Sequence, residues 1–224
     1  MQEKARIAKE MEIAKDIQVS LLPDIKDNEF YEISSFMRTA TEVGGDYFDI
    51  FMDDKPYFGV FGDVSGHGLK SGLVMMMAEV AFNALTKNRD FREKDIKEIY
   101  QSINYTLYKN MQTRLSKKSS IGSNYNHMYM TMRLFRFDEN GNFQMFGNDH
   151  AEPFICRSDT GNIEPIPSSG FLIGILEDAV RGAEIRSFSL NKGDLLVLYS
   201  DGITEAKREK KNGDKLTKRN MFGE

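Results

Sequence analysis

Three stretches of the chain carry apolar residues at the spacing of three and four that is typical of one face of an α-helix. They span residues 1–22, 69–87 and 91–111, and the first ends where Pro23 stops the pattern. The apolar positions are, in chain order, Ile7, Met11, Ala14, Ile17 and Leu21; Leu73, Met76, Met77 and Val80; and Ile96, Ile99, Tyr100, Ile103 and Leu107. We predict three amphipathic helices and assign the methionines of the second to core packing.

Shorter apolar runs and alternating stretches predict β-strands. They cover residues 30–37, 47–52, 57–62, 127–137, 143–146, 153–157, 163–166, 184–190 and 194–200. Turn sequences at residues 53–56, 138–141 and 191–193 predict hairpins between the strands on either side. Because most strands follow one another through short turns, and the two long helices are adjacent in sequence, the predicted fold class is α+β with antiparallel sheets.

Composition narrows the class of protein. The 224 residues, 40% of them hydrophobic, are enough for one large domain or two small ones. A formal net charge of −4 argues against a general nucleic-acid binder. The single cysteine, Cys156, excludes an internal disulfide framework and a thiolate metal cluster, and it fits a reducing compartment. No apolar run approaches the roughly 18 residues needed to span a bilayer, so we expect a soluble cytoplasmic protein.

The main chemical signal is a set of three aspartates, each beside glycine near a predicted strand end. Asp63 closes the run YFGVFGD and precedes the turn SGHG, Asp46 follows two glycines, and Asp201 closes the run DLLVLYSD. Each could simply cap a helix or make a turn. Together, three clustered carboxylates would repel one another unless divalent cations bound them. All-oxygen ligands favour Mg²⁺ or Mn²⁺ over Zn²⁺.

Other polar residues near these aspartates are weaker candidates. Asp49 is either a further ligand or a surface group. His67 could donate a proton or hydrogen-bond within its turn, and Arg38 could grip a phosphate or form a surface ion pair. Of the remaining histidines, we expect His127 to be structural and His150 to lie in a loop between strands.

Three segments resemble, in this order, motifs of the bacterial PPM/PP2C-like serine phosphatases of the SpoIIE and RsbU type. They are residues 43–49 (VGGDYFD), 63–68 (DVSGHG) and 198–206 (LYSDGITEA). Residues 17–23 (IQVSLLP) resemble the end of that family's linker helix, and residues 146–153 resemble its Asn-Ala-Gly-His loop, from which Asp149 and Ala151 depart. The resemblance covers nearly the whole chain from about Ile13.

The resemblance implies an αββα sandwich of two antiparallel sheets flanked by helices, with two Mn²⁺ or Mg²⁺ ions. Asp63 would bridge both ions, the Val64 carbonyl would bind one and Asp201 the other, and Asp46 would be an inner- or outer-shell ligand. The implied reaction is hydrolysis of phosphoserine or phosphothreonine by a metal-activated water. The implied substrate is a phosphorylated anti-sigma-factor antagonist or a similar STAS-type regulator.

The resemblance also implies a domain organisation. Residues 1–22 would form a linker or dimerisation helix joined to an upstream sensor domain, with Ile7, Met11 and Ile17 lining a dimer or switch surface. Residues 23–224 would form the phosphatase domain. The family usually adds a helix and a strand with one more metal carboxylate after the Phe-Gly-Glu segment, so we expect either a truncated chain or a member with a shortened tail.

Two other functions are alternatives to a phosphatase. A degenerate phosphatase domain acting as a dimeric signalling scaffold would suit the altered loop around His150 and the missing tail. A diguanylate cyclase, suggested by Gly44-Gly45-Asp46, is rejected because only 43 residues precede the motif and the helix-flanked parallel architecture of such a cyclase is missing from the pattern.

Overall fold

The structure, a computed structural model, describes residues 2–39, 43–115, 128–148 and 151–206, and these form two compact units. The larger unit contains the long helices α1 (Gln2–Leu21), α2 (Leu69–Thr86) and α4 (Ile96–Tyr108), with the short α3 (Arg89–Arg92) between the last two. A π-helical segment, η1 (Lys109–Leu115), continues α4. The predicted helices are therefore confirmed, except that residues 91–111 divide among three elements.

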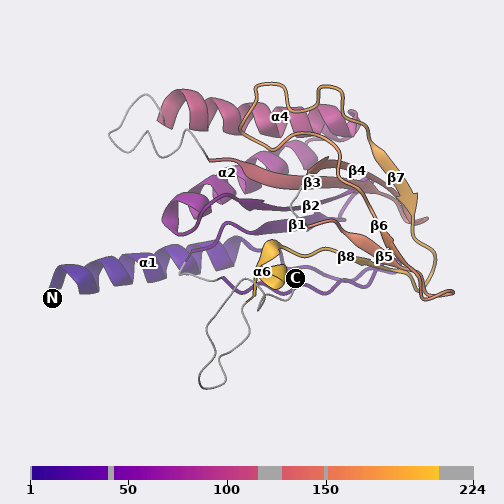
Figure 1. Ribbon diagram of the computed structural model, residues 1–224, viewed down its shortest axis with the longest axis horizontal. Coiled ribbons are helices and arrows are strands. Elements are labelled where there is room, and N and C mark those ends of the chain that lie inside the picture. The colour runs from indigo at the N-terminus through magenta and orange to yellow at the C-terminus, as the bar shows by residue number, and fades with distance from the viewer. Residues whose placement is uncertain (1, 40–42, 116–127, 149–150, 207–224) are drawn as a thin grey trace, which may run out of the picture. The chain divides into compact units, whose positions relative to one another are not determined.

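One antiparallel sheet forms the larger unit's framework, and its five described strands lie in the order β1-β2-β3-β4-β7. They are β1 (Tyr47–Phe51), β2 (Tyr57–Val64), β3 (Met130–Phe137), β4 (Asn142–Asn148) and β7 (Arg186–Ser189). Helices α2 and α4 cover one face of this sheet (Figure 1). The predicted hairpins β1–β2 and β3–β4 are both present.

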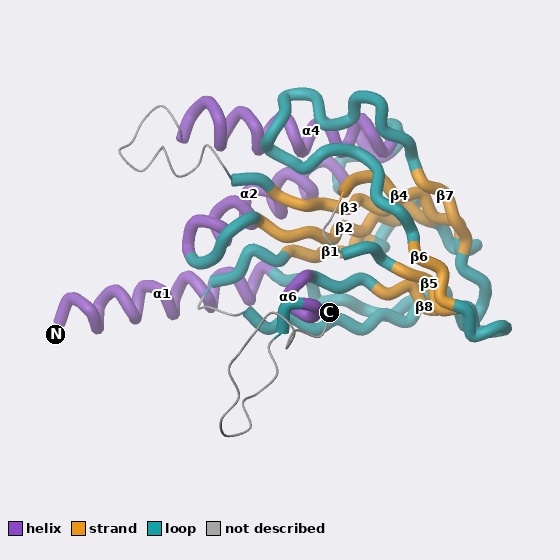
Figure 2. Tube along the Cα trace, in the orientation of Figure 1, coloured by secondary structure: helices purple, strands orange, loops and turns teal. Residues whose placement is uncertain are grey.

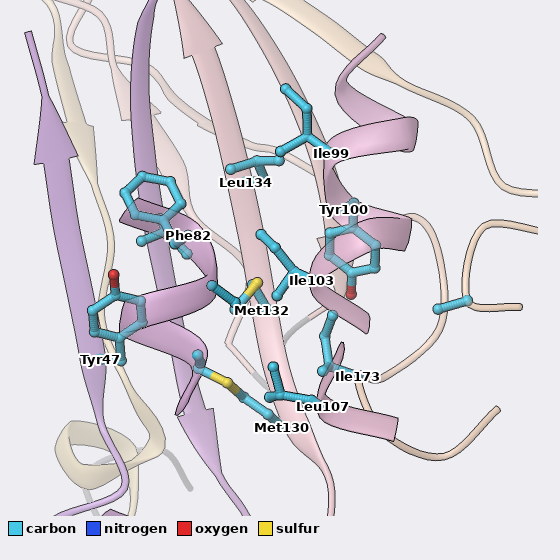
Figure 3. Close-up of a cluster of buried hydrophobic side chains, with 14 of the residues drawn as sticks. Tyr47, Phe82, Ile99, Tyr100, Ile103, Leu107, Met130, Met132, Leu134 and Ile173 are labelled. Atoms are coloured by element: carbon cyan, nitrogen blue, oxygen red, sulfur yellow. The ribbon is translucent and has the colours of Figure 1, made fainter. Parts of the chain in front are cut away.

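The hydrophobic core lies between that sheet face and the two helices (Figure 3). Alternate strand residues such as Val60, Val64 and Leu134 point into it, as do Phe82 from α2 and Ile103 from α4. Each of these five side chains is at most 4% exposed. Since side chains alternate along a strand, the residues between them point to the opposite face of the sheet.

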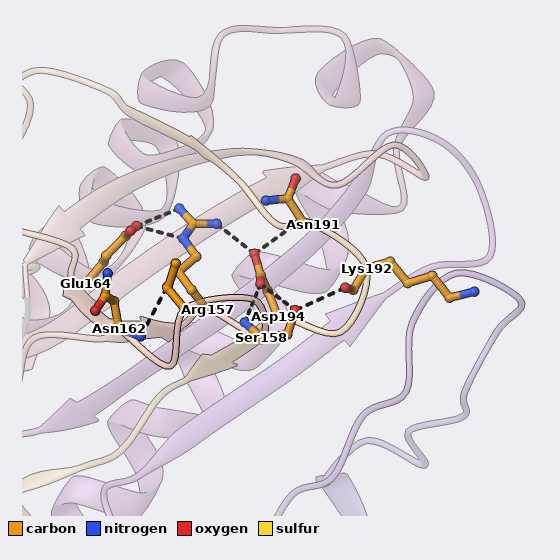
Figure 4. A network of polar contacts seen from close by, with 8 residues as sticks. Arg157, Ser158, Asn162, Glu164, Asn191, Lys192 and Asp194 are labelled. Atoms are coloured by element: carbon orange, nitrogen blue, oxygen red, sulfur yellow. Dashed lines mark hydrogen bonds and ion pairs between the residues drawn. The ribbon is translucent and has the colours of Figure 1, made fainter.

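The smaller unit contains a sheet whose described strands lie in the order β6-β5-β8. They are β5 (Phe154–Cys156), β6 (Ile163–Pro165) and β8 (Leu195–Val197), followed by the single turn α6 (Asp201–Thr204). Arg157 ties the unit together: it donates to Glu164 Oε2 from Nε at 2.8 Å and from Nη2 at 2.6 Å, and to Asp194 Oδ2 from Nη1 at 2.7 Å (Figure 4). The two antiparallel sheets with flanking helices confirm the predicted α+β class.

One predicted hairpin and one predicted strand are wrong. Residues 184–190 and 194–200 do not form a hairpin, because β7 pairs with β4 and β8 pairs with β5 in the other sheet. Residues 30–37 form no strand; they belong to the long loop between α1 and β1 (Figure 2), where the Asn28 side chain binds the Phe30 and Tyr31 amides and Phe36 is 85% exposed. Among the strands that the structure describes, none pairs with residues 30–37.

The packing face of α2 also differs from the prediction. The buried side is Val74, Met75, Ala78, Ala81 and Phe82. In the predicted stripe, Leu73 and Val80 are 44% and 63% exposed, and Met76 and Met77 are half-buried beside α4. A helix that is apolar nearly all round does not show its buried side by spacing alone. None of the described helices is both long and apolar enough to cross a membrane.

Candidate metal centre

Asp63 lies near the end of β2, and both its backbone N–H and its backbone C=O are hydrogen-bonded to one side chain. The Thr131 hydroxyl of β3 accepts from the Asp63 amide at 2.9 Å and donates to its carbonyl at 3.2 Å. The turn that follows uses Gly66 and Gly68 at φ of 89° and 80°, which glycine adopts without strain. The N-cap of α2 is Gly68. Asp63 is thus not a helix cap, and the reading of this segment as an ordinary capped turn is excluded.

The Gly45 backbone lies directly against Asp63 and Val64. The Val64 amide donates to the Gly45 carbonyl at 3.2 Å. A Cβ atom added at Gly45 would lie 2.6 Å from Asp63 Oδ1 and 2.7 Å from the Val64 carbonyl oxygen. A carboxylate oxygen and a backbone carbonyl oxygen therefore converge on one small space that glycine leaves open.

The strand register brings Asp46 beside Asp63. Tyr47 pairs with Gly62, and the Val64–Gly45 hydrogen bond continues the antiparallel ladder, so Asp46 lies opposite Asp63. Opposite residues point to the same face with Cβ atoms about 5 Å apart. Tyr47 and Val64 belong to the core beneath the helices, so the two aspartates face the other side of the sheet, and both are half-buried.

These groups suit a hard divalent cation. Two neighbouring carboxylates repel each other, and a bound cation removes that repulsion. Carboxylate and carbonyl oxygens are the ligands that Mg²⁺ and Mn²⁺ prefer. Among the residues that the structure describes, no group of three or more His, Cys, Asp or Glu side chains is close enough to hold a metal. Asp201, the first residue of α6, belongs to the smaller unit, and its approach to Asp46 and Asp63 stays a prediction.

Asp49 is neither a ligand beside Asp46 nor a surface group. It points to the helix face and is 9% exposed. Its Oδ2 accepts from Asn83 Nδ2 at 3.0 Å and from the Tyr47 hydroxyl at 3.3 Å, and its Oδ1 accepts from the Ile50 amide at 2.8 Å. Burial raises the pKa of Asp49 despite these hydrogen bonds, and burial with the nearby Asp49 charge raises the pKa of Tyr47.

The remaining sequence candidates are at the surface or outside the described residues. Arg38 and His67 are both exposed, and their role stays a prediction. His127 and His150 lie outside the described residues, as does Asp149.

The sequence motifs predicted no role for four residues that lie near the site. Gly45 and Thr131 shape the Asp63 environment, and Arg133, buried on the same sheet face as Asp63, donates from Nη2 to Ser168 Oγ at 2.6 Å. The sequence does offer a sign of Arg133, because a charged residue inside the mainly apolar strand MTMRLFRF is unusual. The fourth, Gln18, has no such signal, because its partner Gly44 is 26 residues away.

Comparison with known proteins agrees with the fold and the motifs. The family model for Stage II sporulation protein E (SpoIIE) matches residues 53–221, well over half of the chain. Phosphoserine phosphatase RsbU of Bacillus subtilis is 25% identical over 207 residues, covering 91% of this chain and 56% of its own length. The chain spans between 33% and 56% of the length of the curated relatives RsbU, RsbP and IcfG.

Solved structures share the architecture. The SiaA-PP2C domain of Pseudomonas aeruginosa superposes with a TM-score of 0.66 at 20% identity, over 92% of this chain and 77% of that one. The catalytic domain of the serine threonine protein phosphatase PstP, solved with two manganese ions, gives a TM-score of 0.50 at 12% identity, over 75% and 74% of the two chains. With this PP2C-like fold and the family match over most of its length, the chain belongs to the SpoIIE family.

Proposed function

We propose that this chain is a metal-dependent protein serine/threonine phosphatase that acts in the cytoplasm on a phosphorylated bacterial regulatory protein. One observation carries the proposal: Asp63 Oδ1 and the Val64 carbonyl oxygen converge over Gly45, with Asp46 opposite Asp63. That donor set suits Mn²⁺ or Mg²⁺. Family membership and the name of RsbU, a phosphoserine phosphatase, support the same activity.

The chain's own residues would hold the ions and fix their position. Asp46, Asp63, Val64 and Asp201 are the proposed ligands, and Thr131 keeps the Asp63 backbone in place through its two hydrogen bonds. Two bound ions would supply a water of lowered pKa and neutralise charge on the phosphoryl oxygens. Arg38 and His67, both exposed, are proposed to meet the substrate phosphate.

The proposed partners follow from the family. The substrate would be an anti-sigma-factor antagonist of STAS type carrying phosphoserine or phosphothreonine. Helix α1 would connect to an upstream sensor domain and pair with its copy in a homodimer. Ile7 and Ile17 on this helix are 46% and 49% exposed, which leaves apolar surface for such a contact.

Phosphate release from a phosphoserine protein, measured with and without Mn²⁺, tests the activity. We expect release only with the metal, and loss of it in Asp63→Asn. Asp95→Asn is the matched control, because Asp95 caps α4 through the Lys97 amide and asparagine caps a helix equally well. Release that persists without metal or in Asp63→Asn would contradict the proposal. If neither Mn²⁺ nor Mg²⁺ binds while a partner protein still does, the chain is a phosphatase-like signalling scaffold instead.

A further inference from the structure

The side chain of Gln18 makes a matched pair of hydrogen bonds with the backbone N–H and C=O of Gly44, beside the candidate metal centre. Its Nε2 donates to the Gly44 carbonyl at 2.7 Å, and its Oε1 accepts from the Gly44 amide at 2.9 Å. Gln18 is 2% exposed, although its helical neighbours Ile17 and Val19 are 49% and 54% exposed. On the last turns of α1, the buried position is therefore taken by an amide and not by an apolar side chain.

The segment that Gln18 holds is also fixed from two other sides. Val43 is 1% exposed, and its Cγ1 lies 2.2 Å from where a Cβ of Gly72 on α2 would stand. Gly45 lies against Asp63 and Val64, as described above. Residues 43–46 are thus held by α1 at Gly44, by α2 at Val43 and by β2 at Gly45, and Asp46 follows directly.

The Gln18 amide satisfies both backbone groups of Gly44 at once, because it carries a donor and an acceptor on one planar group. A buried peptide N–H or C=O without a partner is costly, so loss of the side-chain amide would favour movement of the segment toward other partners or water. A leucine has neither donor nor acceptor. A carboxylate accepts from the Gly44 amide but repels the Gly44 carbonyl oxygen, so it satisfies one group only.

We propose that Gln18 is a positioning residue for the metal centre: by holding Gly44, it keeps Gly45 and Asp46 against Asp63 and Val64. The metal affinity of the site then depends on where α1 lies. This inference rests on the proposed metal-dependent function. It adds to that function a residue outside the ligand set, and it makes the end of α1 part of the site.

The experiment compares Gln18→Leu with Gln101→Leu. Gln101 on α4 makes the same kind of pair, donating to the Glu177 carbonyl at 2.6 Å and accepting from the Ala179 amide at 2.9 Å, on a loop that does not contribute to the centre. Calorimetric titration with Mn²⁺ should show about 10-fold weaker binding or more in Gln18→Leu, as for other residues that orient metal ligands. Gln101→Leu should bind Mn²⁺ like the parent chain.

A second measurement is independent of the metal. Amide hydrogen exchange in metal-free protein should be faster at Gly44 and at Val64, whose amide donates to Gly45, in Gln18→Leu but not in Gln101→Leu. Gln18→Glu, which keeps the acceptor, should lie between parent and Gln18→Leu in both measurements and serves if the leucine variant fails to fold.

The outcomes separate the two proposals. Unchanged exchange at Gly44 and Val64 in both Gln18 variants overturns the role of Gln18, whatever the metal does. Equal Mn²⁺ affinity in the parent and Gln18→Leu overturns it too. A parent chain that binds no Mn²⁺ refutes the proposed function, and the exchange measurement still decides whether Gln18 holds the segment.

Discussion

Asn83 on α2 donates from Nδ2 to Asp49 Oδ2 on β1 at 3.0 Å. The same nitrogen donates to Glu79 Oε1 at 2.9 Å, so one amide bridges two carboxylates. Burial raises the pKa of both acids, and the charge of Asp49 raises the pKa of Glu79 further. Since an acid whose pKa is raised on folding destabilises the native state when ionised, stability falls as pH rises through the folded-state pKa values.

Glu79→Gln should relieve part of this repulsion and keep an oxygen acceptor for Asn83. Because Glu79 is partly exposed, we expect a gain of only about 0.3 to 0.5 kcal/mol in unfolding free energy at pH 7. The gain should vanish below about pH 4, where both carboxyl groups are protonated. Urea unfolding at pH 7 and pH 4 measures it. Glu12→Gln, at an exposed position on α1, is the control and should show no such gain.

Asp194→Asn should destabilise the smaller unit. The amides of Ser158 and Asn191, followed by Arg157, hold the pKa of Asp194 well below its usual range. A lowered pKa contributes stability above the unfolded-state value of about 4, and this is lost as pH falls through the folded-state value. The variant should therefore unfold earlier in urea at pH 7 and approach the parent only in strong acid. Asp159→Asn, exposed one residue beyond Ser158, should match the parent throughout.

Gly45→Ala should disrupt the candidate metal centre. The new Cβ would stand 2.6 Å from Asp63 Oδ1 and 2.7 Å from the Val64 carbonyl oxygen. Either the end of β2 or the Asp63 carboxylate must therefore move. We expect a loss of about 1–3 kcal/mol in stability together with weaker Mn²⁺ binding. Gly59→Ala, on the same strand pair, meets Ile50 Cγ1 at an ordinary 3.5 Å and should keep Mn²⁺ affinity. Parent-like binding in Gly45→Ala would contradict the convergence at this site.

Neighbouring methionines on α2 test which face of the helix packs on the sheet. Met75 is 1% exposed, so Met75→Ala should cost about 2–5 kcal/mol in unfolding free energy. Met77 is half-buried beside α4, and Met77→Ala should cost about 1 kcal/mol or less. Equal losses in chemical denaturation would mean that the face inferred from burial is wrong.

Met11→Lys tests the proposed dimer surface on α1. Met11 is half-buried and lies one helical turn from Ile7, which is 46% exposed. A lysine there should halve the mass measured by light scattering, if the parent is a dimer, while Glu12→Lys on an exposed position should leave it unchanged. A dimeric Met11→Lys protein would argue that α1 does not form the interface.

Sequence periodicity predicted the elements that local interactions define. The stripe from Ile96 to Leu107 is fully buried, and the β1–β2 and β3–β4 hairpins form where turn residues joined apolar strands. The prediction of a hairpin over residues 184–200 failed because strand pairing there depends on distant parts of the chain. The predicted turn is present, since Asp194 donates its amide to the Asn191 carbonyl at 3.0 Å, but the strands on either side pair in different sheets.

The candidate site was predictable to a similar extent. The motifs pointed to Asp46, Asp63 and Val64, and the backbone pairing of β1 with β2 brings these residues near one another; their role as metal ligands stays a prediction. They did not reveal that Asp49, three residues after Asp46, faces the opposite side of the sheet into a buried network. Nor did they identify Gln18, because a hydrogen bond between a side chain and a distant peptide follows from tertiary packing and leaves no periodic trace.

The pairing of β7 and β8 in different sheets has a consequence for the nascent chain. A ribosome releases β5 and β6 well before β8, with β7 intervening, and β5 needs β8 on its other edge. Among the described strands, β5 and β6 are then the only two of this sheet until residues 195–197 emerge, and a two-stranded ribbon is marginally stable in water. The open edge of β5 is then available to any other extended chain, so chaperone capture during synthesis should concentrate on chains that have not yet reached β8.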